Sequence, residues 1–548
     1  MGGGGFLLNY SSCIIFTLVK TNAAKKEKKM RKITKGLMFG AVAAMSAMSL
    51  AACSGGGGEE TTTAGGDTTA ASQDTSKKEM KVAISFSNDS LDCHKESFGW
   101  YTQIEGMSET LFRVDDDSKV VPLLAESAEN EGTLWTIKLN DKAAFSNGTK
   151  LTADMVARNL QRVGAESGKF KAYADFEIKA VDDTTLTIDT KDPYPTLKNE
   201  LSSPEMGIMD LDATTDFVNA PIFTGPFVID KFTPGGDVSV KKNENYWNGD
   251  VVLDKIDFLY MMDDSSKLMA MQNGEIDWYN SVSADAIAIY QKEPDKYTLT
   301  SIPGERSQFY FLNENNISIN VRKAINSIVD KEAIAKFLEG STSASDGPFN
   351  PSAAYGKVAA PAKVDLETAK KLMEDDGYTL NGNGIYEKDG KEVNLTVKYY
   401  EARELDKVAT LMQEQLKAAG INTTLKAEED TEGYVTTGDY DIALYCMITD
   451  KFGDPYYFIN NTLADGGYYN AGGFKNEECQ KLIDQLKSEE DVAKRADLAN
   501  QIVQIAVDDA YMGYVGLFNK TTVAKPGITG ISADNPYDFY GVYSNTSF

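Results

Sequence analysis

The segment from residue 54 to residue 79 contains Gly, Thr, Ser, Ala and scattered charge, but no large apolar side chain. Such a composition cannot offset the entropy lost when a backbone becomes ordered, so it predicts a flexible tether. A packed fold can therefore begin only near residue 80. The chain has 548 residues, which leaves enough sequence beyond that point for two or three domains.

A short apolar run precedes the tether. Arg31, Lys32 and Lys35 come first without an acidic neighbour, and residues 37–50 are then apolar apart from one Gly and two Ser. At about 1.5 Å per residue, a helix of this length is too short to span a bilayer core. The pattern instead predicts a signal peptide.

The signal ends in Leu-Ala-Ala-Cys at residues 50–53, which resembles a bacterial lipobox. This resemblance implies a lipid on Cys53 and an anchor on the outer face of the cell membrane or on a periplasmic face, since two or more acyl chains hold a protein durably. Ordinary secretory cleavage at the small residues is the alternative. Because Met30 opens the signal, we interpret residues 1–29 as an upstream extension, and residues 1–53 together as leader and signal peptide.

The charge of the chain limits its partners. The net charge is −27, although residues 1–52 carry eight Lys or Arg and one Glu, so the remainder is more acidic still. Such acidity disfavours nucleic acids and anionic lipids, and it favours cationic solutes. We therefore expect contact with the membrane through the lipid anchor only, and none with nucleic acid.

The number of cysteines is too small for a disulfide framework. Beyond the leader, three remain: Cys93, Cys446 and Cys479. An odd, sparse set leaves room for at most a single pair.

Strand and helix patterns alternate after residue 80. Residues 81–87 (KVAISFS) place Val82, Ile84 and Phe86 on one face of a strand, and residues 133–139 (TLWTIKL) show the same period of two. A helix is predicted over 152–163, opened by Thr152. The apolar stripe in 404–419 predicts a second helix that ends at Gly420 before another strand. These patterns predict a mixed α/β body.

Five motifs in order make the chain resemble the family 5 extracellular solute-binding proteins, which include the peptide and nickel receptors of ABC importers. The motifs are ETLFRVDDDSKVVPLLAES, TIKLNDKAAFSNGTKLTADMV, GPFVIDKFTPGGDVSVKKNENYW, AMQNGEIDW and VRKAINSIVDKEAIAKFL. The resemblance implies an α/β, two-lobe periplasmic-binding-protein-like fold with two hinge crossings, and a ligand enclosed between the lobes. It also implies an ABC permease and ATPase as partners.

The resemblance suggests where the lobes begin and end. The crossings are expected near SIPGERSQFYFLN and DAYMGYVGLFN. Lobe I then comprises residues 80–303 with 516–548, and lobe II comprises residues 304–515. The expected function is capture of short peptides for import, and the alternative is a nickel or nickel-chelate receptor of the same family.

The peptide interpretation rests on Asp450. In peptide-binding relatives, an aspartate shortly before an Asp-Pro pair takes the ammonium group of the peptide, and Asp450 precedes Asp454-Pro455 by one residue more than expected. A carboxylate opposite an ammonium group in a closed cleft forms a charge-assisted hydrogen bond. The alternative is an aspartate that caps a turn.

The nickel interpretation rests on residues that match the nickel-receptor branch. His94 and Arg403 stand at positions that face the cleft there, and Trp100 and Tyr101 follow the histidine. A chain with one histidine cannot surround nickel with imidazoles, the ligand that Ni²⁺ favours. Nickel would therefore arrive chelated, with His94 completing its coordination and Arg403 pairing with chelator carboxylates. A structural histidine is the alternative.

Aromatic residues complete the predicted pocket. Tyr310, Tyr399 and Tyr445, like Trp100, suit the wall of an organic pocket, although each could equally belong to the core. No zinc-protease, nucleophile-elbow or phosphate-loop motif occurs in the sequence. We therefore expect a binding protein without cofactor rather than an enzyme.

Overall fold

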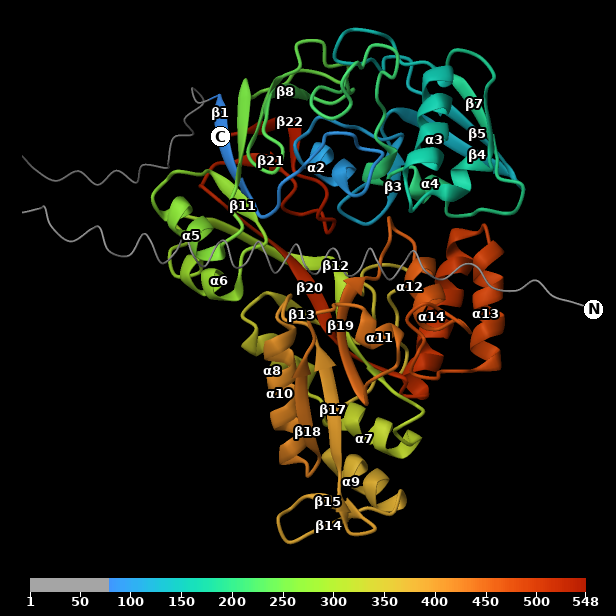
Figure 1. Cartoon of the computed structure of the whole chain (residues 1–548), viewed down its shortest axis with the longest axis vertical. Coiled ribbons are helices and arrows are strands. Elements are labelled where there is room, and N and C mark those ends of the chain that lie inside the picture. The colour runs from blue at the N-terminus through green and yellow to red at the C-terminus, as the bar shows by residue number, and fades with distance from the viewer. Residues whose placement is uncertain (1–77) are drawn as a thin grey trace, which may run out of the picture. The chain divides into compact units, whose positions relative to one another are not determined.

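The computed structural model describes residues 78–548, so Cys53, the predicted signal peptide and nearly all of the predicted tether lie outside the described range. Within that range, an eleven-stranded sheet runs through the protein in the order β18-β17-β19-β12-β20-β11-β1-β10-β9-β8, with β13 paired to β20 (Figure 1). Its strands are β1 (Glu79–Ile84), β8 (Phe227–Phe232), β9 (Val238–Lys242), β10 (Lys255–Tyr260), β11 (Trp278–Asn280), β12 (Thr298–Leu312), β13 (Thr342–Ala344), β17 (Asn394–Tyr399), β18 (Asn422–Ala427), β19 (Ile442–Ile448) and β20 (Met512–Ala524).

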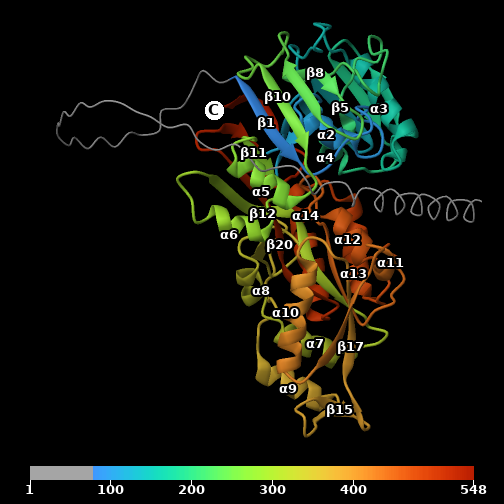
Figure 2. The same ribbon diagram turned by 60° about the vertical axis from the view of Figure 1, so that its left-hand side comes forward.

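Two long strands, β12 and β20, form the middle of this sheet. They pair with each other in antiparallel register from Thr298↔Ala524 to Phe311↔Met512, with an irregularity between Pro303 and Arg306. Both predicted crossing segments overlap these two strands, whereas the lobe boundaries drawn from them stay a prediction. On one side β20 continues to β11 and β1, and on the other β12 continues to β19 and β17 (Figure 1); Figure 2 shows the same strands from another side, without a label on β19.

The hydrophobic cores separate on the two sides of the β12–β20 pair. Two clusters draw their residues from the range 309–515, and two others come from residues 80–278, joined in one case by Ala524 and Val542. Each side therefore has its own large cores, while one small cluster joins Phe452 to residues of the other side: Val114, Tyr537, Phe539 and Tyr540. The sheet is the continuous element that joins them.

The N-terminal half contains a second, four-stranded sheet in the order β4-β5-β7-β6, with α3 among its contacts. Inward residues of β5 alternate as predicted, with Trp135, Ile137 and Leu139 buried. Helix α3 also confirms its prediction, since the Thr152 side chain accepts a hydrogen bond from the backbone N–H of Met155. These elements are β4 (Ala125–Glu131), β5 (Leu134–Leu139), β6 (Glu177–Ala180), β7 (Thr185–Asp189) and α3 (Ala153–Glu166).

Shorter elements connect the sheets of this half. They are α2 (Phe98–Ile104), α4 (Leu197–Glu200), α5 (Asp264–Gln272), α6 (Ala284–Tyr290), the 3₁₀ turns Lys171–Ala174 and Pro204–Met206, and the strands β2 (Phe112–Val114), β3 (Val120–Pro122), β21 (Thr529–Ile531) and β22 (Val542–Ser547). Glu109 anchors one loop, because Tyr246 Oη and Trp247 Nε1 donate to its carboxyl group at 2.7 and 2.8 Å. Burial raises the pKa of Glu109 to about 7.

Helices flank the sheet in the second half. They are α7 (Ile319–Ile328), α8 (Lys331–Phe337), α9 (Leu366–Asp375), α10 (Leu405–Ala418), α11 (Gly433–Thr436), α12 (Tyr456–Thr462), α13 (Glu477–Ser488) and α14 (Val492–Asp508), with a small sheet of β14 (Thr379–Leu380), β15 (Tyr386–Lys388) and β16 (Lys391–Glu392). Helix α10 confirms the helix predicted over 404–419, and Gly420 after it takes a left-handed φ of 90°.

One strand prediction is wrong in part. Phe86 was expected to share a face with Val82 and Ile84, but β1 ends at Ile84. Phe86 lies beyond the strand, is exposed, and contacts the Tyr101 ring edge-on at 5.0 Å between ring centres. The chain leaves the sheet here because the segment turns toward α2.

Candidate ligand cavity

Two adjoining compartments lie beside the β12–β20 pair. Their volumes are about 750 and 660 Å³, which is the size range of pockets for small organic ligands. Both compartments are lined by Trp100, Lys169, Glu305, Arg306, Arg403 and Ile448. These shared residues come from the N-terminal half, from β12, from the end of β19 and from the segment after β17, so both halves of the protein contribute walls.

Arg403 stands immediately before α10 in a strained backbone. Its φ is 53° and that of Glu404 is 61°, both in the left-handed region, and Gln308 Nε2 donates to the Arg403 carbonyl at 2.7 Å. The guanidinium group donates to the Cys446 carbonyl at 3.0 Å and to Tyr400 Oη at 3.3 Å. Within residues 78–548, no carboxylate oxygen lies within 4.0 Å of its nitrogens. The hydrogen-bond partners of this positive charge are therefore neutral, and Asp538 acts on the charge without forming an ion pair with it.

Lys451 is another cationic group that lines the smaller compartment. Its Nζ lies 4.5 Å from the ring centre of Tyr457, 5.8 Å from that of Phe170 and 5.9 Å from that of Phe452. Burial lowers the pKa of Lys451. The aromatic rings stabilise the ammonium group by cation–π attraction, which leaves its hydrogen-bond donors available to a solute.

Helix α2 provides aromatic wall to the larger compartment. Trp100 and Tyr101 both line it, and Trp100 packs edge-on against Phe539 at 5.1 Å. Tyr445 lines the smaller compartment. Four of the predicted site residues, Arg403, Trp100, Tyr101 and Tyr445, thus meet at this cavity.

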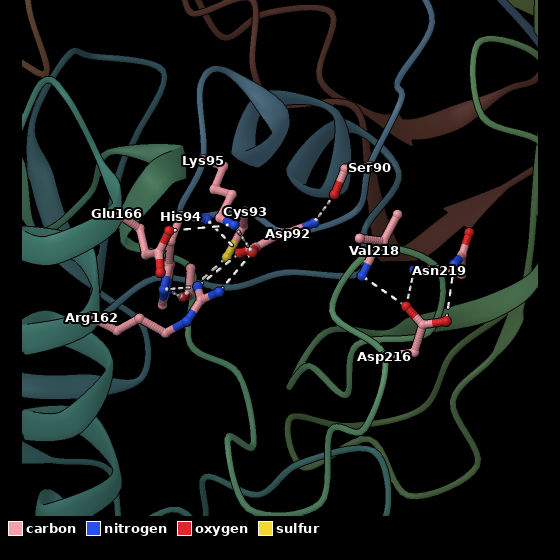
Figure 3. A network of polar contacts seen from close by, with 11 residues as sticks. Ser90, Asp92, Cys93, His94, Lys95, Arg162, Glu166, Asp216, Val218 and Asn219 are labelled. Carbon is pink, nitrogen blue, oxygen red and sulfur yellow. Dashed lines mark hydrogen bonds and ion pairs between the residues drawn. The ribbon is translucent and has the colours of Figure 1, made fainter.

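His94 lies elsewhere, in a buried network below α2 (Figure 3). Arg162 donates from Nη1 to His94 Nδ1 at 2.9 Å, so Nε2 carries the proton and donates to the Gly207 carbonyl at 2.8 Å. The same guanidinium group makes two hydrogen bonds to Asp92, at 2.8 and 2.6 Å. Burial and the neighbouring Arg162 charge lower the pKa of His94 to about 4. Both ring nitrogens are occupied within the fold, and His94 is not among the cavity-lining residues.

Asp450 also has its partners within the fold. Its Oδ1 accepts from the backbone N–H of Gly453 at 2.8 Å and from Tyr537 Oη at 2.7 Å, and Oδ2 accepts from Tyr355 Oη at 2.6 Å. Burial raises the pKa of Asp450 to about 6. The residue does not line either compartment. This placement matches the turn-stabilising alternative and gives the peptide interpretation no ammonium partner at this position.

Two predicted tyrosines belong to the core. Tyr310 is buried and donates to Asn326 Oδ1 at 2.8 Å, and Tyr399 packs at the edge of two core clusters. Neither lines the two compartments. The sequence prediction does not include Glu305, Arg306 and Lys451, which line the compartments. Glu305 and Arg306 are the only charged residues of the crossing segment SIPGERSQFYFLN, a pattern that could have identified them.

The described part of the chain contains no cluster of three or more His, Cys, Asp or Glu side chains suited to a metal ion. Cys93, Cys446 and Cys479 are buried, free thiols, so the single disulfide left open by the sequence does not form among them. Burial raises the pKa of each thiol, which makes them weak metal ligands.

Comparison with known proteins places the chain in a family. Residues 119–470 match the description "Bacterial extracellular solute-binding proteins, family 5 Middle". This protein is a family 5 extracellular solute-binding protein. The nickel-binding protein NikA of Staphylococcus aureus is 30% identical over 428 residues, which cover 76% of this chain and 84% of the relative. The glutathione-binding protein GsiB of Pectobacterium atrosepticum is 25% identical over 379 residues, covering 66% and 73%.

A solved structure agrees with this assignment. The nickel ABC transporter protein from Bacillus halodurans superposes with a TM-score of 0.78 at 26% identity, and the match covers 86% of this chain and 100% of that one. The two-lobe α/β fold predicted for this solute-binding protein is thereby confirmed. In residues 78–548, no helix combines the length and the apolar composition that crossing a membrane requires.

Proposed function

We propose that this solute-binding protein captures a nickel ion already held by a small carboxylate-bearing chelator and delivers it to an ABC permease with its ATPase. The observation that carries the proposal is Arg403, whose guanidinium group lies in the cavity wall without a carboxylate partner. A carboxylate of the chelator would accept two parallel, charge-assisted hydrogen bonds from this guanidinium group. His94, the single histidine of the chain, is committed to Arg162 and Gly207, so the nickel ligands come from the chelator.

A short peptide is the second candidate. Arg403 or Lys451 would then bind the terminal carboxylate of the peptide. The similarity to a glutathione-binding protein supports a peptide as short as glutathione. In either case, the lobes bounded at residues 80–303 with 516–548 and at 304–515 would close around the solute. The protein acts as a receptor, and the permease and ATPase perform the transport.

Calorimetry separates the two candidates. The probes are Ni²⁺ with two equivalents of L-histidine, each component alone, and glutathione. We expect the nickel–histidine mixture to bind, and Arg403→Gln to weaken that binding about thirty-fold or more, since truncating a desolvated charge pair costs roughly 2 to 5 kcal/mol. Arg158→Gln is the matched control, because Arg158 pairs with Asp154 and Asp212 on the surface of α3. Binding of glutathione without binding of the nickel mixture would establish the second candidate instead.

We also propose that Cys53 carries the lipid that anchors the receptor. Cys53→Ala should leave the protein unacylated, either unprocessed or released, without changing solute affinity, because the tether precedes the folded body. Membrane fractionation with metabolic acyl labelling tests this. A variant that still carries acyl chains and stays with the membrane would contradict the lipobox interpretation.

A further inference from the structure

Glu305 is a carboxyl group that the fold leaves without a hydrogen-bond partner. It lies in β12, in the irregular stretch between Pro303 and Arg306, and only 4% of its surface is exposed. Its backbone is fixed, since the Glu305 carbonyl accepts from the backbone N–H of Thr449 at 3.0 Å. Its Oε1 nevertheless accepts no hydrogen bond from any residue in the range 78–548. A buried polar atom of this kind needs an explanation, because leaving it unpaired costs free energy.

The same side chain borders both compartments of the cavity. Glu305 and Arg403 are among the six residues shared by the two compartments. A carboxyl group and a guanidinium group therefore both line the region where the compartments join. Asp450, by contrast, already accepts hydrogen bonds from Tyr355, Tyr537 and the backbone N–H of Gly453. Glu205 is the other buried carboxyl group that lines a compartment, and it is paired with Lys169 and Ser203. Glu305 therefore differs from it in having a carboxyl oxygen without a hydrogen-bond donor in the described residues.

Charges of both signs surround Glu305. Arg306 Nη2 lies 3.8 Å from Oε1, too far for a hydrogen bond, and is also 3.6 Å from Asp538. In addition to burial, the negative charges of Asp538 and Asp450 raise the pKa of Glu305, and the positive charge of Lys520 lowers it. Burial outweighs the cations and raises the pKa of Glu305 to about 8. The group thus holds a proton in the empty cavity at neutral pH and can release it when a cation arrives.

We propose that Glu305 accepts a hydrogen bond from an amino group of the solute while Arg403 pairs with a carboxylate of the same solute. The solute is then recognised through the amine and carboxylate of an amino acid, whether that amino acid chelates nickel or ends a peptide. This inference rests on the proposed function. It adds an amino group as a required feature of the solute. It also predicts that Glu305 releases its proton when the solute binds.

The sign of the pH dependence follows from this proton release. Affinity for an amine-bearing solute should rise as the pH increases toward about 8, because less work is then needed to deprotonate Glu305. Above that pH, deprotonation of the solute's own ammonium group limits the rise. Lys520 has a pKa lowered by burial to about 8 as well, so it titrates in the same range. The pH profile must therefore be compared between variants of both residues.

The experiment combines calorimetry with infrared difference spectroscopy on the full chain. Preformed nickel–histidine complex and glutathione are titrated from pH 6 to pH 9 into the wild type, Glu305→Gln and Lys520→Met. We expect Glu305→Gln to bind about ten- to a hundred-fold more weakly above pH 8 and to lose the rise of affinity with pH. Lys520→Met should keep the part of the rise that Glu305 causes. Glu109→Gln, a buried carboxyl away from the cavity with a raised pKa, should match the wild type.

Infrared spectra provide a readout that does not depend on which solute is physiological. The empty wild type should show a protonated-carboxyl band that is absent in Glu305→Gln, and millimolar methylammonium should convert it to a carboxylate band. A band unaffected by methylammonium, an affinity that falls with pH, or a full pH rise in Glu305→Gln would each overturn the proposal. If methylammonium converts the band but neither nickel–histidine nor glutathione binds, the Glu305 assignment stands and the proposed function fails.

Discussion

Whether a polar side chain can bind solute depends, in this protein, on what the fold has already given it. Both ring nitrogens of His94 and both carboxyl oxygens of Asp450 have hydrogen-bond partners within the fold, most of them distant in the sequence. Arg403 contacts only neutral oxygen atoms, and Glu305 Oε1 contacts no donor in the described residues. The candidate ligand contacts are therefore the incompletely paired groups of the cavity wall.

The lowered pKa of His94 predicts acid sensitivity. A histidine whose pKa falls from about 6.5 unfolded to about 4 folded takes up its proton only in the unfolded chain between those values. The folded protein should therefore lose on the order of 3 kcal/mol as the pH decreases from 6.5 to 4. Because His94 is the only histidine, His94→Gln should remove this loss.

Denaturant unfolding at several pH values measures this effect. Glutamine keeps a donor for the Gly207 carbonyl but has no proton to gain, so its stability profile between pH 6.5 and 4 should be flatter than that of the wild type. Equal slopes for the two proteins would show that His94 is already protonated in the folded state.

At the scale of elements, the irregular stretch of β12 shapes the cavity. Gly304 precedes Glu305 and lies so close to β20 that a Cβ atom there would be 2.6 Å from the Phe518 carbonyl oxygen. Backbone cannot yield as a flexible side chain can, so glycine is needed for β12 and β20 to approach at this point. The irregularity between Pro303 and Arg306 presents Glu305 and Arg306 together at the cavity.

Gly304→Ala should therefore cost about 1 to 3 kcal/mol of stability and weaken solute binding, because β12 must move away from β20. Thermal denaturation and calorimetry measure the two effects. Gly382→Ala is the control: Gly382 has nothing within 4 Å of the position of its Cβ and does not take a left-handed φ, so its replacement should change neither quantity. An unchanged Gly304→Ala would mean that the strands can separate without loss.

Sequence reasoning predicted the elements better than the cavity wall. Helices α3 and α10 follow from a local period and a local cap or glycine stop, so their prediction needs no distant information. Whether His94 and Asp450 can contact a solute depends instead on hydrogen-bond partners distant in the sequence. These partners are Arg162, Gly207, Tyr355 and Tyr537. The family resemblance supplied positions for the site, but it could not show which of them this chain had satisfied internally.

At the scale of the whole molecule, two separate cores and one shared sheet suit a receptor that closes around its solute. The segment 450–453 belongs to the half that contains β19, yet it contacts the other half, where Asn199 Nδ2 donates to the Phe452 carbonyl at 2.8 Å and Tyr537 Oη donates to Asp450. Phe452 also packs against Phe539, which in turn touches Trp100 of the cavity wall. Contacts between the halves therefore extend to the cavity.

Closure predicts a smaller radius of gyration with solute bound. Small-angle scattering of the receptor with and without nickel–histidine complex, or with glutathione if that binds instead, measures the change. Arg403→Gln at the same solute concentration should stay nearer the value of the empty protein. An unchanged radius at saturating solute would contradict the hinged mechanism, whichever solute proves to be physiological.

The pairing of β12 with β20 has an evolutionary consequence. Backbone hydrogen bonds join β12 and β20 along their length in the middle of the sheet, so a closing motion about this pair would depend on the backbone rather than on any side chain of the cavity. Substitutions in the cavity wall can then change which solute binds while the closing motion stays the same. One such scaffold can diversify among metal complexes and peptides by exchanging a few wall residues.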